Sequence, residues 1–206
     1  MELDKQLKPI HFKQCSNNIK NKMFANAVKS NDIRVVHYLI NKDLMLPRNF
    51  HITAAEYGNL QCLKYCVHEQ MEFNDLTILS AIISNDIECV NYVFSYCTDH
   101  YKHEIYYRKY YKEAICEGDV EIVDYLRKNT NIPFSKKSCM FAVLNNSDTD
   151  CFKYLVDNGC KLNKRVVEQA AMRYINYGSL IFLQYLLNIQ YNMAGAYDVA
   201  VKYNHR

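Results

Sequence analysis

The stretch Ala54-Ala55-Glu56-Tyr57-Gly58-Asn59-Leu60-Gln61-Cys62-Leu63-Lys64-Tyr65 decides the fold, because its spacing recurs along the chain. The recurring phrase is an alanine, a glycine or asparagine four residues later, and a tyrosine seven residues after that. Four copies keep this spacing, and they begin at Ala27, Ala54, Ala81 and Ala114. A regular repeat of this length indicates stacked supersecondary units that bury a shared core. We therefore expect function to lie on a surface of the stack and not in a pocket.

Three further copies depart from the phrase. The fifth, Ala142, Asn146 and Tyr154, has one extra residue before its tyrosine. In the sixth, Tyr174 takes the place of the alanine before Gly178 and Tyr185, and a seventh begins at Ala200 and Asn204. We therefore expect about six complete repeats and the start of another.

Each repeat is predicted to be a helical hairpin. Apolar residues at helical spacing lie on both sides of Gly58, which predicts a helix over about 49–57, a turn at Gly58-Asn59 and a second, antiparallel helix over about 60–68. The turn position alternates between glycine and asparagine, the residues that best tolerate a left-handed backbone. The alanine allows close packing between neighbouring first helices, and a larger side chain there is expected to overpack. The fold class is all-α, a solenoid of stacked helix-turn-helix repeats.

The second helices share an apolar signature, and these positions are expected to form the stacking core. They are Ile33, Val35, Val36, Tyr38 and Leu39; Ile87, Cys89, Val90, Tyr92 and Val93; Val120, Ile122, Val123, Tyr125 and Leu126; and Leu180, Phe182, Leu183, Tyr185 and Leu186.

The composition limits which classes of function the chain can have. The net charge of +3 over 47 charged residues is too small to predict a nucleic-acid or membrane partner, and no stretch is long enough to span a bilayer. Residues 1–5 have no basic start followed by an apolar run, and nine cysteines favour reduced thiols over a disulfide framework. We expect a cytoplasmic protein without cofactors.

The repeat phrase resembles the ankyrin repeat, in Ala54 to Leu60 and in Gly118-Asp119-Val120-Glu121-Ile122-Val123. It is most similar to the divergent, tyrosine-rich ankyrin arrays of giant DNA viruses of amoebae such as mimivirus. The resemblance implies an N-terminal capping segment over 1–22, an array over 23–206, and a non-enzymatic protein that binds a partner protein in its concave groove. If the chain is viral, that partner is a host protein in the host cytoplasm.

The chain departs from the ankyrin pattern in two ways. The Thr-Pro-Leu-His opening is absent, and most spacings are shorter than the usual repeat of about 33 residues, so the β-hairpin fingers are expected to be short or irregular. The chain also ends at the turn of its seventh repeat, as an unusual cap or a truncated end.

In ankyrin stacks the residues just before the turn residue line the groove. By this resemblance the groove residues are Lys29 and Ser30, Glu56 and Tyr57, Ile83 and Ser84, Cys116 and Glu117, Leu144 and Asn145, and Asn176 and Tyr177. Their chemistry varies from copy to copy, as it would in a binding surface or in any solvated face.

A basic, tyrosine-rich segment lies over residues 100–112, at the longest spacing between repeats. Its site candidates are Tyr101, Tyr106, Tyr107, Arg108, Tyr110 and Tyr111. Tyrosines between cations are compatible with stacking on nucleic-acid bases, or with a protein-binding hot spot. The alternative is a lengthened helix whose tyrosines pack inward while its lysines are solvated.

Metal and catalytic sites are the weakest hypotheses. Cys62, Cys66 and His68, and also Cys97, His100 and His103, have spacings that could present ligands on one helical face, but no paired Cys-x-x-Cys knuckle accompanies them. Cys62 and Cys89 occupy a position that is apolar in other copies, which predicts core residues. Cys116 is a candidate exposed thiol, but no histidine or lysine is obviously paired with it. We therefore expect neither an enzyme nor a small-molecule substrate.

Overall fold

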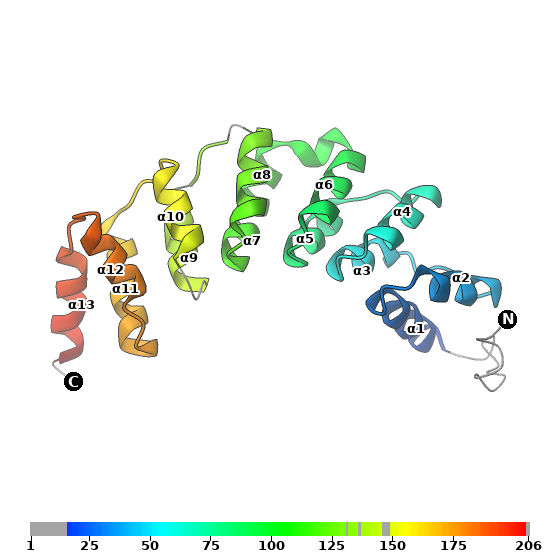
Figure 1. The fold of residues 1–206 in the computed structure, drawn as a ribbon, viewed down its shortest axis with the longest axis horizontal. Helices are drawn as coiled ribbons and strands as arrows, with labels where there is room; N and C mark the ends of the chain where they lie inside the picture. The colour runs from blue at the N-terminus through cyan, green and yellow to red at the C-terminus, as the bar shows by residue number, and fades with distance from the viewer. Residues whose placement is uncertain (1–15, 131, 136, 146–148, 205–206) are drawn as a thin grey trace. The chain divides into compact units, whose positions relative to one another are not determined.

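The computed structural model describes residues 16–130, 132–135, 137–145 and 149–204, and its regular structure in these residues is helical. The chain divides into two compact units between Thr98 and Asp99. The break falls within the longest gap between repeat alanines, from Ala81 to Ala114. Each unit is a run of helical hairpins (Figure 1).

The described part of the first unit, residues 16–98, contains three hairpins. Their helices are α1 (Asn17–Lys29) with α2 (Ile33–Asn41), α3 (Phe50–Glu56) with α4 (Leu60–His68), and α5 (Asp75–Ile83) with α6 (Ile87–Tyr96). In each hairpin the first helix packs on the second, and the neighbouring first helices α1, α3 and α5 pack on one another. The predicted hairpin over 49–68 is therefore confirmed, with helix ends within one residue of the expected ones.

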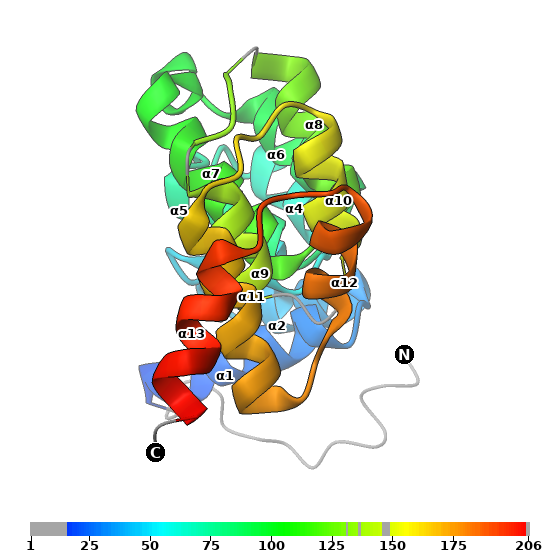
Figure 2. The same cartoon turned by 90° about the vertical axis from the view of Figure 1, so that its left-hand side faces the viewer.

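The described residues of the second unit form three more hairpins and one further helix. Its elements are the 3-10 turn η3 (Asp99–Lys102), α7 (Glu104–Glu117) with α8 (Val120–Thr130), α9 (Ser138–Asn145) with α10 (Asp150–Asp157), α11 (Lys164–Tyr177) with α12 (Ile181–Asn188), and α13 (Ala194–Asn204). The first helices α9, α11 and α13 lie side by side in Figures 1 and 2, and α7 packs on α9. The all-α repeat solenoid is the observed fold.

The turn residues adopt the predicted left-handed backbone. Their φ angles are 54° at Asn31, 60° at Gly58, 59° at Asn85, 83° at Gly118 and 69° at Gly178. An L side chain pays a steric cost in this region, which asparagine reduces and glycine avoids. Asn146, the expected turn residue of the fifth copy, lies outside the described residues.

A second series of left-handed residues closes the second helices, and the repeat phrase does not predict it. Asp43, Gln70, Gly159 and Gln190 have φ angles of 62°, 56°, 84° and 55°. After α4, for example, the backbone N–H of Gln70 donates to Val67 and that of Met71 donates to Cys66, both within 3.0 Å. This pair of bonds satisfies helix-terminal carbonyls that would otherwise have no partner.

The repeat alanines lie in the core. Ala27, Ala54, Ala81, Ala114 and Ala142 are at most 2% exposed. Each is part of a buried pattern on the first helix, such as Phe50, His51, Ala54 and Ala55 on α3. A small side chain at this position lets neighbouring first helices approach closely, as expected.

The sixth copy requires a correction. Tyr174 does not replace the alanine, because it is 46% exposed, whereas Ala170 is fully buried within the pattern Val166, Val167, Ala170 and Ala171. Ala170 follows Ala142 by 28 residues, which keeps the period. Helix α11 continues for one additional turn beyond this core before Gly178, so the spacing from alanine to glycine is eight residues and not four. One turn takes about 3.6 residues, which explains why the core face is preserved.

The end of the chain also differs from the expectation. Ala200 is exposed, and residues up to Asn204 continue α13 as a helix. The close contact of α13 is at Gly195, which is buried and where an added Cβ would lie 2.9 Å from the carbonyl oxygen of Lys164. Five residues correspond to about 140° around a helix, so Ala200 points away from this contact. His205 and Arg206 lie outside the described residues.

Ten of the twenty expected second-helix core positions are buried, including Val36, Cys89, Ile122, Val123 and Phe182. Nine more are half-buried, and Leu180 is the one exposed position among the twenty. It caps α12 and is 41% exposed, so it does not belong to the stacking core. The described connections between hairpins contain no β-strand, in agreement with the expectation of short or irregular fingers.

Candidate functional site

The candidate binding residues lie at or next to the C-terminal ends of the first helices. In the first unit we call Lys29, Ser30, Glu56, Tyr57, Ile83 and Ser84 the unit-1 face. In the second unit we call Cys116, Glu117, Leu144, Asn145, Asn176 and Tyr177 the unit-2 face. The two faces are described separately.

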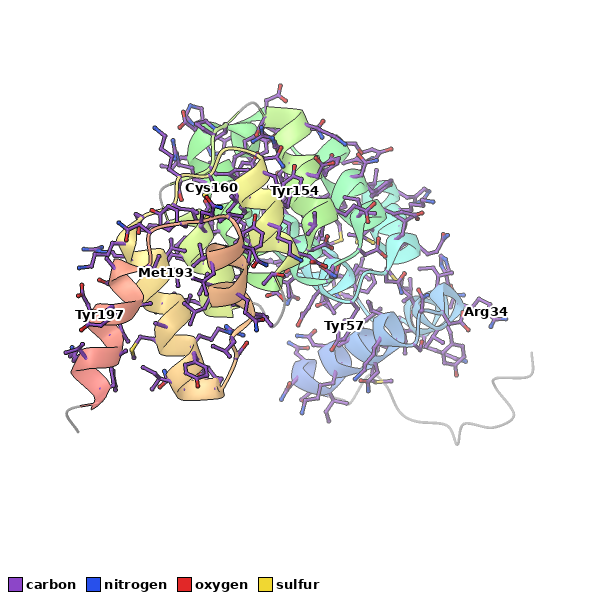
Figure 3. All side chains as sticks on the ribbon, turned by 60° about the vertical axis from the view of Figure 1, so that its left-hand side comes forward. Arg34, Tyr57, Tyr154, Cys160, Met193 and Tyr197 are labelled. Carbon is purple, nitrogen blue, oxygen red and sulfur yellow. The ribbon has the colours of Figure 1, made fainter. Side chains whose placement is uncertain are left out.

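The unit-1 face combines charged and apolar side chains. Tyr57 is 45% exposed and Ile83 is 46% exposed, while Lys29 and Glu56 are also exposed. The hydroxyls of Ser30 and Ser84 donate to the carbonyls of Ala27 and Ala81 at 2.7 Å. Those hydroxyl protons are therefore engaged within the helix, and the available contacts are the two large side chains and the two charges. Figure 3 labels Tyr57 on this face.

Buried hydrogen bonds between repeats hold the unit-1 face in place. Asn59, which is 1% exposed, donates from Nδ2 to the carbonyl of Val28 at 2.9 Å and accepts from the backbone N–H of Cys62 at 3.0 Å. His51 Nδ1 and Thr77 Oγ1 lie 2.8 Å apart between α3 and α5. Burial lowers the pKa of His51 from its ordinary value of 6.5, which favours the neutral ring. These bonds fix neighbouring helices relative to each other.

The unit-2 face is more apolar at its C-terminal end. Leu144 is 47% exposed and Tyr177 is 78% exposed. Asn145 donates from Nδ2 to the carbonyl of Phe141 at 2.9 Å and lies 3.4 Å from the sulfur of Cys116. Burial, together with the carboxylate of Glu113, raises the pKa of the Cys116 thiol. A raised pKa keeps the thiol protonated at neutral pH, so this environment does not activate it as a nucleophile.

The longer α11 changes which residues of the sixth repeat correspond to the groove positions. In the corrected register, Met172 and Arg173 are equivalent to Glu56 and Tyr57, while Asn176 and Tyr177 lie one turn further on. Tyr174, Ile175 and Tyr177 of this additional turn are all at least 40% exposed. Asn176 and Tyr177 therefore remain surface residues, but on an extension of the face.

Arg173 was missed by the sequence analysis. Its Nη1 donates to the carbonyls of Val143 at 2.7 Å and Leu144 at 3.1 Å, at the end of α9. Its guanidinium also lies 5.8 Å from the ring centre of Tyr177 and 5.4 Å from that of Phe182. A cation near the C-terminal carbonyls of a helix is favourable. The 28-residue spacing from Ala142 to Ala170 was the sequence signal that could have identified this position.

The basic, tyrosine-rich segment folds as η3 and the beginning of a long α7. Tyr107, Tyr110 and Tyr111 are buried, at 8%, 0% and 4% exposure. Tyr106 is half-buried, and its hydroxyl lies 3.2 Å from His100 Nε2. Tyr101 is half-buried too, and Arg108 pairs with Glu104 at 2.6 Å. The arrangement is that of the lengthened helix, in which three of the five candidate tyrosines are not available to stack on bases.

The candidate metal ligands are not brought together. Cys62 and Cys66 are fully buried, which raises the pKa of both thiols to about 12, whereas the side chain of His68 is 81% exposed beside Glu69. Cys97 is buried, while His100 and His103 are exposed. Across residues 16–204, apart from the gaps at 131, 136 and 146–148, no three His, Cys, Asp or Glu side chains form a group that could hold a metal ion.

No described helix is long and apolar enough to cross a membrane. No protein-family model matches the chain, and no solved structure matches it. The protein R837 of Acanthamoeba polyphaga mimivirus, which is named as an ankyrin repeat protein, is 26% identical to this chain over 160 residues. The match covers 69% of this chain and 25% of R837, so the chain spans about a quarter of the length of this relative. The similarity supports an ankyrin-like repeat.

Proposed function

We propose that this chain is a non-enzymatic interaction module that binds a partner protein through the unit-1 and unit-2 faces. The main support is that both faces present large exposed side chains, above all Tyr57 and Tyr177, from helices fixed by interrepeat hydrogen bonds. The ankyrin-like similarity adds to this support, because ankyrin repeats generally bind proteins.

The proposed mechanism is preorganised recognition. Ordering a flexible side chain or loop on binding costs about 0.5–1.5 kcal/mol for each side chain immobilised, and a face built on packed helices avoids much of this cost. Tyrosine has few rotatable bonds and a large surface, and it is enriched where binding energy concentrates. Tyr57 and Tyr177 are therefore the expected anchors, with Lys29 and Glu56 contributing to partner selection.

We further propose that the array extends over residues 23–206 behind a capping segment at 1–22, and that the protein is viral and binds a host protein in the host cytoplasm. The similarity to the mimivirus protein supports the viral origin. The described part of the proposed cap, residues 16–22, supplies the N-cap Ser16 and the first turns of α1.

The test is affinity capture from a lysate of Acanthamoeba polyphaga, with and without nuclease treatment. The bait is the full chain, compared with a Tyr57→Ala, Tyr177→Ala variant and with a control, Tyr96→Ala. Tyr96 is a suitable control because it is 53% exposed but lies on a second helix. The proposal predicts that the full chain captures a protein with or without nuclease treatment. The double variant should fail to capture this protein, and the control should still capture it. Capture of nucleic acid alone, by all three baits alike, would contradict it.

A further inference from the structure

A cavity of about 780 Å³ lies on the second unit, and no residue of the unit-2 face lines it. It is formed by the C-terminal half of α8, the segment 132–134 and the turn that follows α10. Figure 3 marks Tyr154 and Cys160, on α10 and just after it, which belong to this side of the unit. Cavities of this size accommodate small ligands or a few side chains of a peptide.

An arginine is held in a defined position in the cavity wall. Arg127 is half-buried, and its Nη1 donates to the carbonyl of Asn158 at 3.1 Å. Its guanidinium lies 5.3 Å from the ring centre of Phe134, which in turn makes T-shaped contacts with the Tyr111 and Tyr154 rings. A guanidinium has five N–H donors in a rigid fork. One carbonyl and one ring therefore orient Arg127 without using all of its donors.

The cavity has more positive than negative charge. Arg127, Lys128 and Lys161 line it, against one carboxylate, Asp124. That carboxylate is already bound by Lys128 Nζ at 2.6 Å and by the Tyr154 hydroxyl at 2.8 Å, and these bonds, together with the nearby Arg127, lower its pKa. Among the described residues, Lys161 is exposed and has no ion pair. Two cations thus face the cavity without a carboxylate of their own.

We propose that this cavity binds an oxyanion, a carboxylate or a phosphate group, between the Arg127 guanidinium and the Lys161 ammonium. Arginine forms bidentate hydrogen bonds with both kinds of group, and lysine adds a mobile charge. Phe134 and Ile132 provide an apolar wall for the remainder of the ligand. The group could belong to a free organic phosphate or to an acidic segment of a protein. This inference does not depend on the function proposed for the two faces.

The test is titration calorimetry of the full chain with phenyl phosphate, inorganic phosphate and a capped triglutamate peptide, at low and at physiological salt. The inference predicts one site for at least one of these probes, with affinity that falls as salt rises. The preferred probe identifies the source, because the phosphates represent a free ligand and the peptide represents an acidic protein segment. Failure of all three probes to bind at millimolar concentration would overturn the inference.

Three variants separate a site from diffuse attraction. Lys161→Gln removes one charge from an exposed side chain and should weaken binding by about five- to tenfold. Lys202→Gln removes the same charge from α13 and should change the affinity less than twofold. Arg127→Lys retains the charge but removes the fork, and should also weaken binding while circular dichroism shows an unchanged fold. Equal losses for Lys161→Gln and Lys202→Gln would refute a localised site.

Discussion

Replacing Asn59 tests whether hydrogen bonds between repeats contribute to stability. Asn59→Ala removes two bonds at a position that is 1% exposed. The first is the cap of α4, where loss of an asparagine typically costs about 1 kcal/mol. The second is the bond to the Val28 carbonyl, which retains one partner, the backbone N–H of Asn31 at 3.0 Å. Loss of the bond between Asn59 and Val28 should therefore lower the free energy of unfolding by about 0.5–1.5 kcal/mol, because the carbonyl is not left unsatisfied. The expected total is about 2 kcal/mol.

Asp86→Ala is the matched control. Asp86 caps α6 in the same way, by accepting from the backbone N–H of Cys89 at 3.0 Å, but no bond from it to the preceding repeat accompanies the cap among the described residues. Its removal should cost about 1 kcal/mol. The assay is urea unfolding followed by circular dichroism, with the free energy of unfolding compared among the three proteins.

Asn59→Asp adds a second comparison. The carboxylate retains the capping acceptor but places an oxygen opposite the Val28 carbonyl, and burying this charge is costly. This variant should be at least as unstable as Asn59→Ala at neutral pH. The reasoning fails if Asn59→Ala costs no more than Asp86→Ala, or if Asn59→Asp is as stable as the unmodified chain.

Three further predictions concern a buried histidine, a turn and the corrected register. Burial lowers the pKa of His51 below 6.5, so below that pH the unfolded chain binds a proton that the folded chain resists. Stability should therefore fall as the pH is lowered from 7.5 to 5.5, and His51→Gln should reduce this slope in urea titrations. Gly178→Ala should lower the free energy of unfolding by about 1–2 kcal/mol in the same assay, because φ at this position is 69°. An added Cβ would meet no atom within 4 Å, so the cost arises from the backbone conformation alone. An unchanged urea midpoint would contradict the turn geometry. Ala170→Leu should overpack the core and destabilise the fold by about 1–3 kcal/mol, whereas Tyr174→Leu should change stability by less than about 0.5 kcal/mol in thermal melts. If Tyr174→Leu were the more destabilising variant, Tyr174 and not Ala170 would be the equivalent of the repeat alanine.

The features that could be predicted from the sequence depend on local sterics and on period. Asn31, Gly58 and Asn85 mark left-handed turns because few other residues tolerate that backbone, and the alanines recur because close helix packing demands a small side chain. The additional turn in α11 was missed because it lengthens the spacing between Ala170 and Gly178 while leaving the buried face intact. The repeat phrase depends on the spacing from alanine to glycine, which the additional turn changes. The buried face depends on the helical period, which the additional turn preserves.

Other features depend on tertiary packing that a repeat phrase does not encode. Gln70 and Gln190 adopt left-handed conformations although neither is glycine or asparagine, because the closing hydrogen bonds of the helix stabilise them. Composition did not reveal that Tyr110 would be buried and Tyr101 only half-buried. Burial of Tyr110 depends on which side of α7 faces the neighbouring helices.

The most direct test of the proposed binding faces is site-specific photocrosslinking. A benzophenone amino acid is placed at Tyr57, at Tyr177 and, as the control, at Tyr96, and each protein is irradiated in nuclease-treated Acanthamoeba polyphaga lysate. The account predicts a discrete protein adduct from position 57 or 177 and none from position 96. An adduct pattern that is the same at all three positions, or absent from both candidate faces, would contradict it.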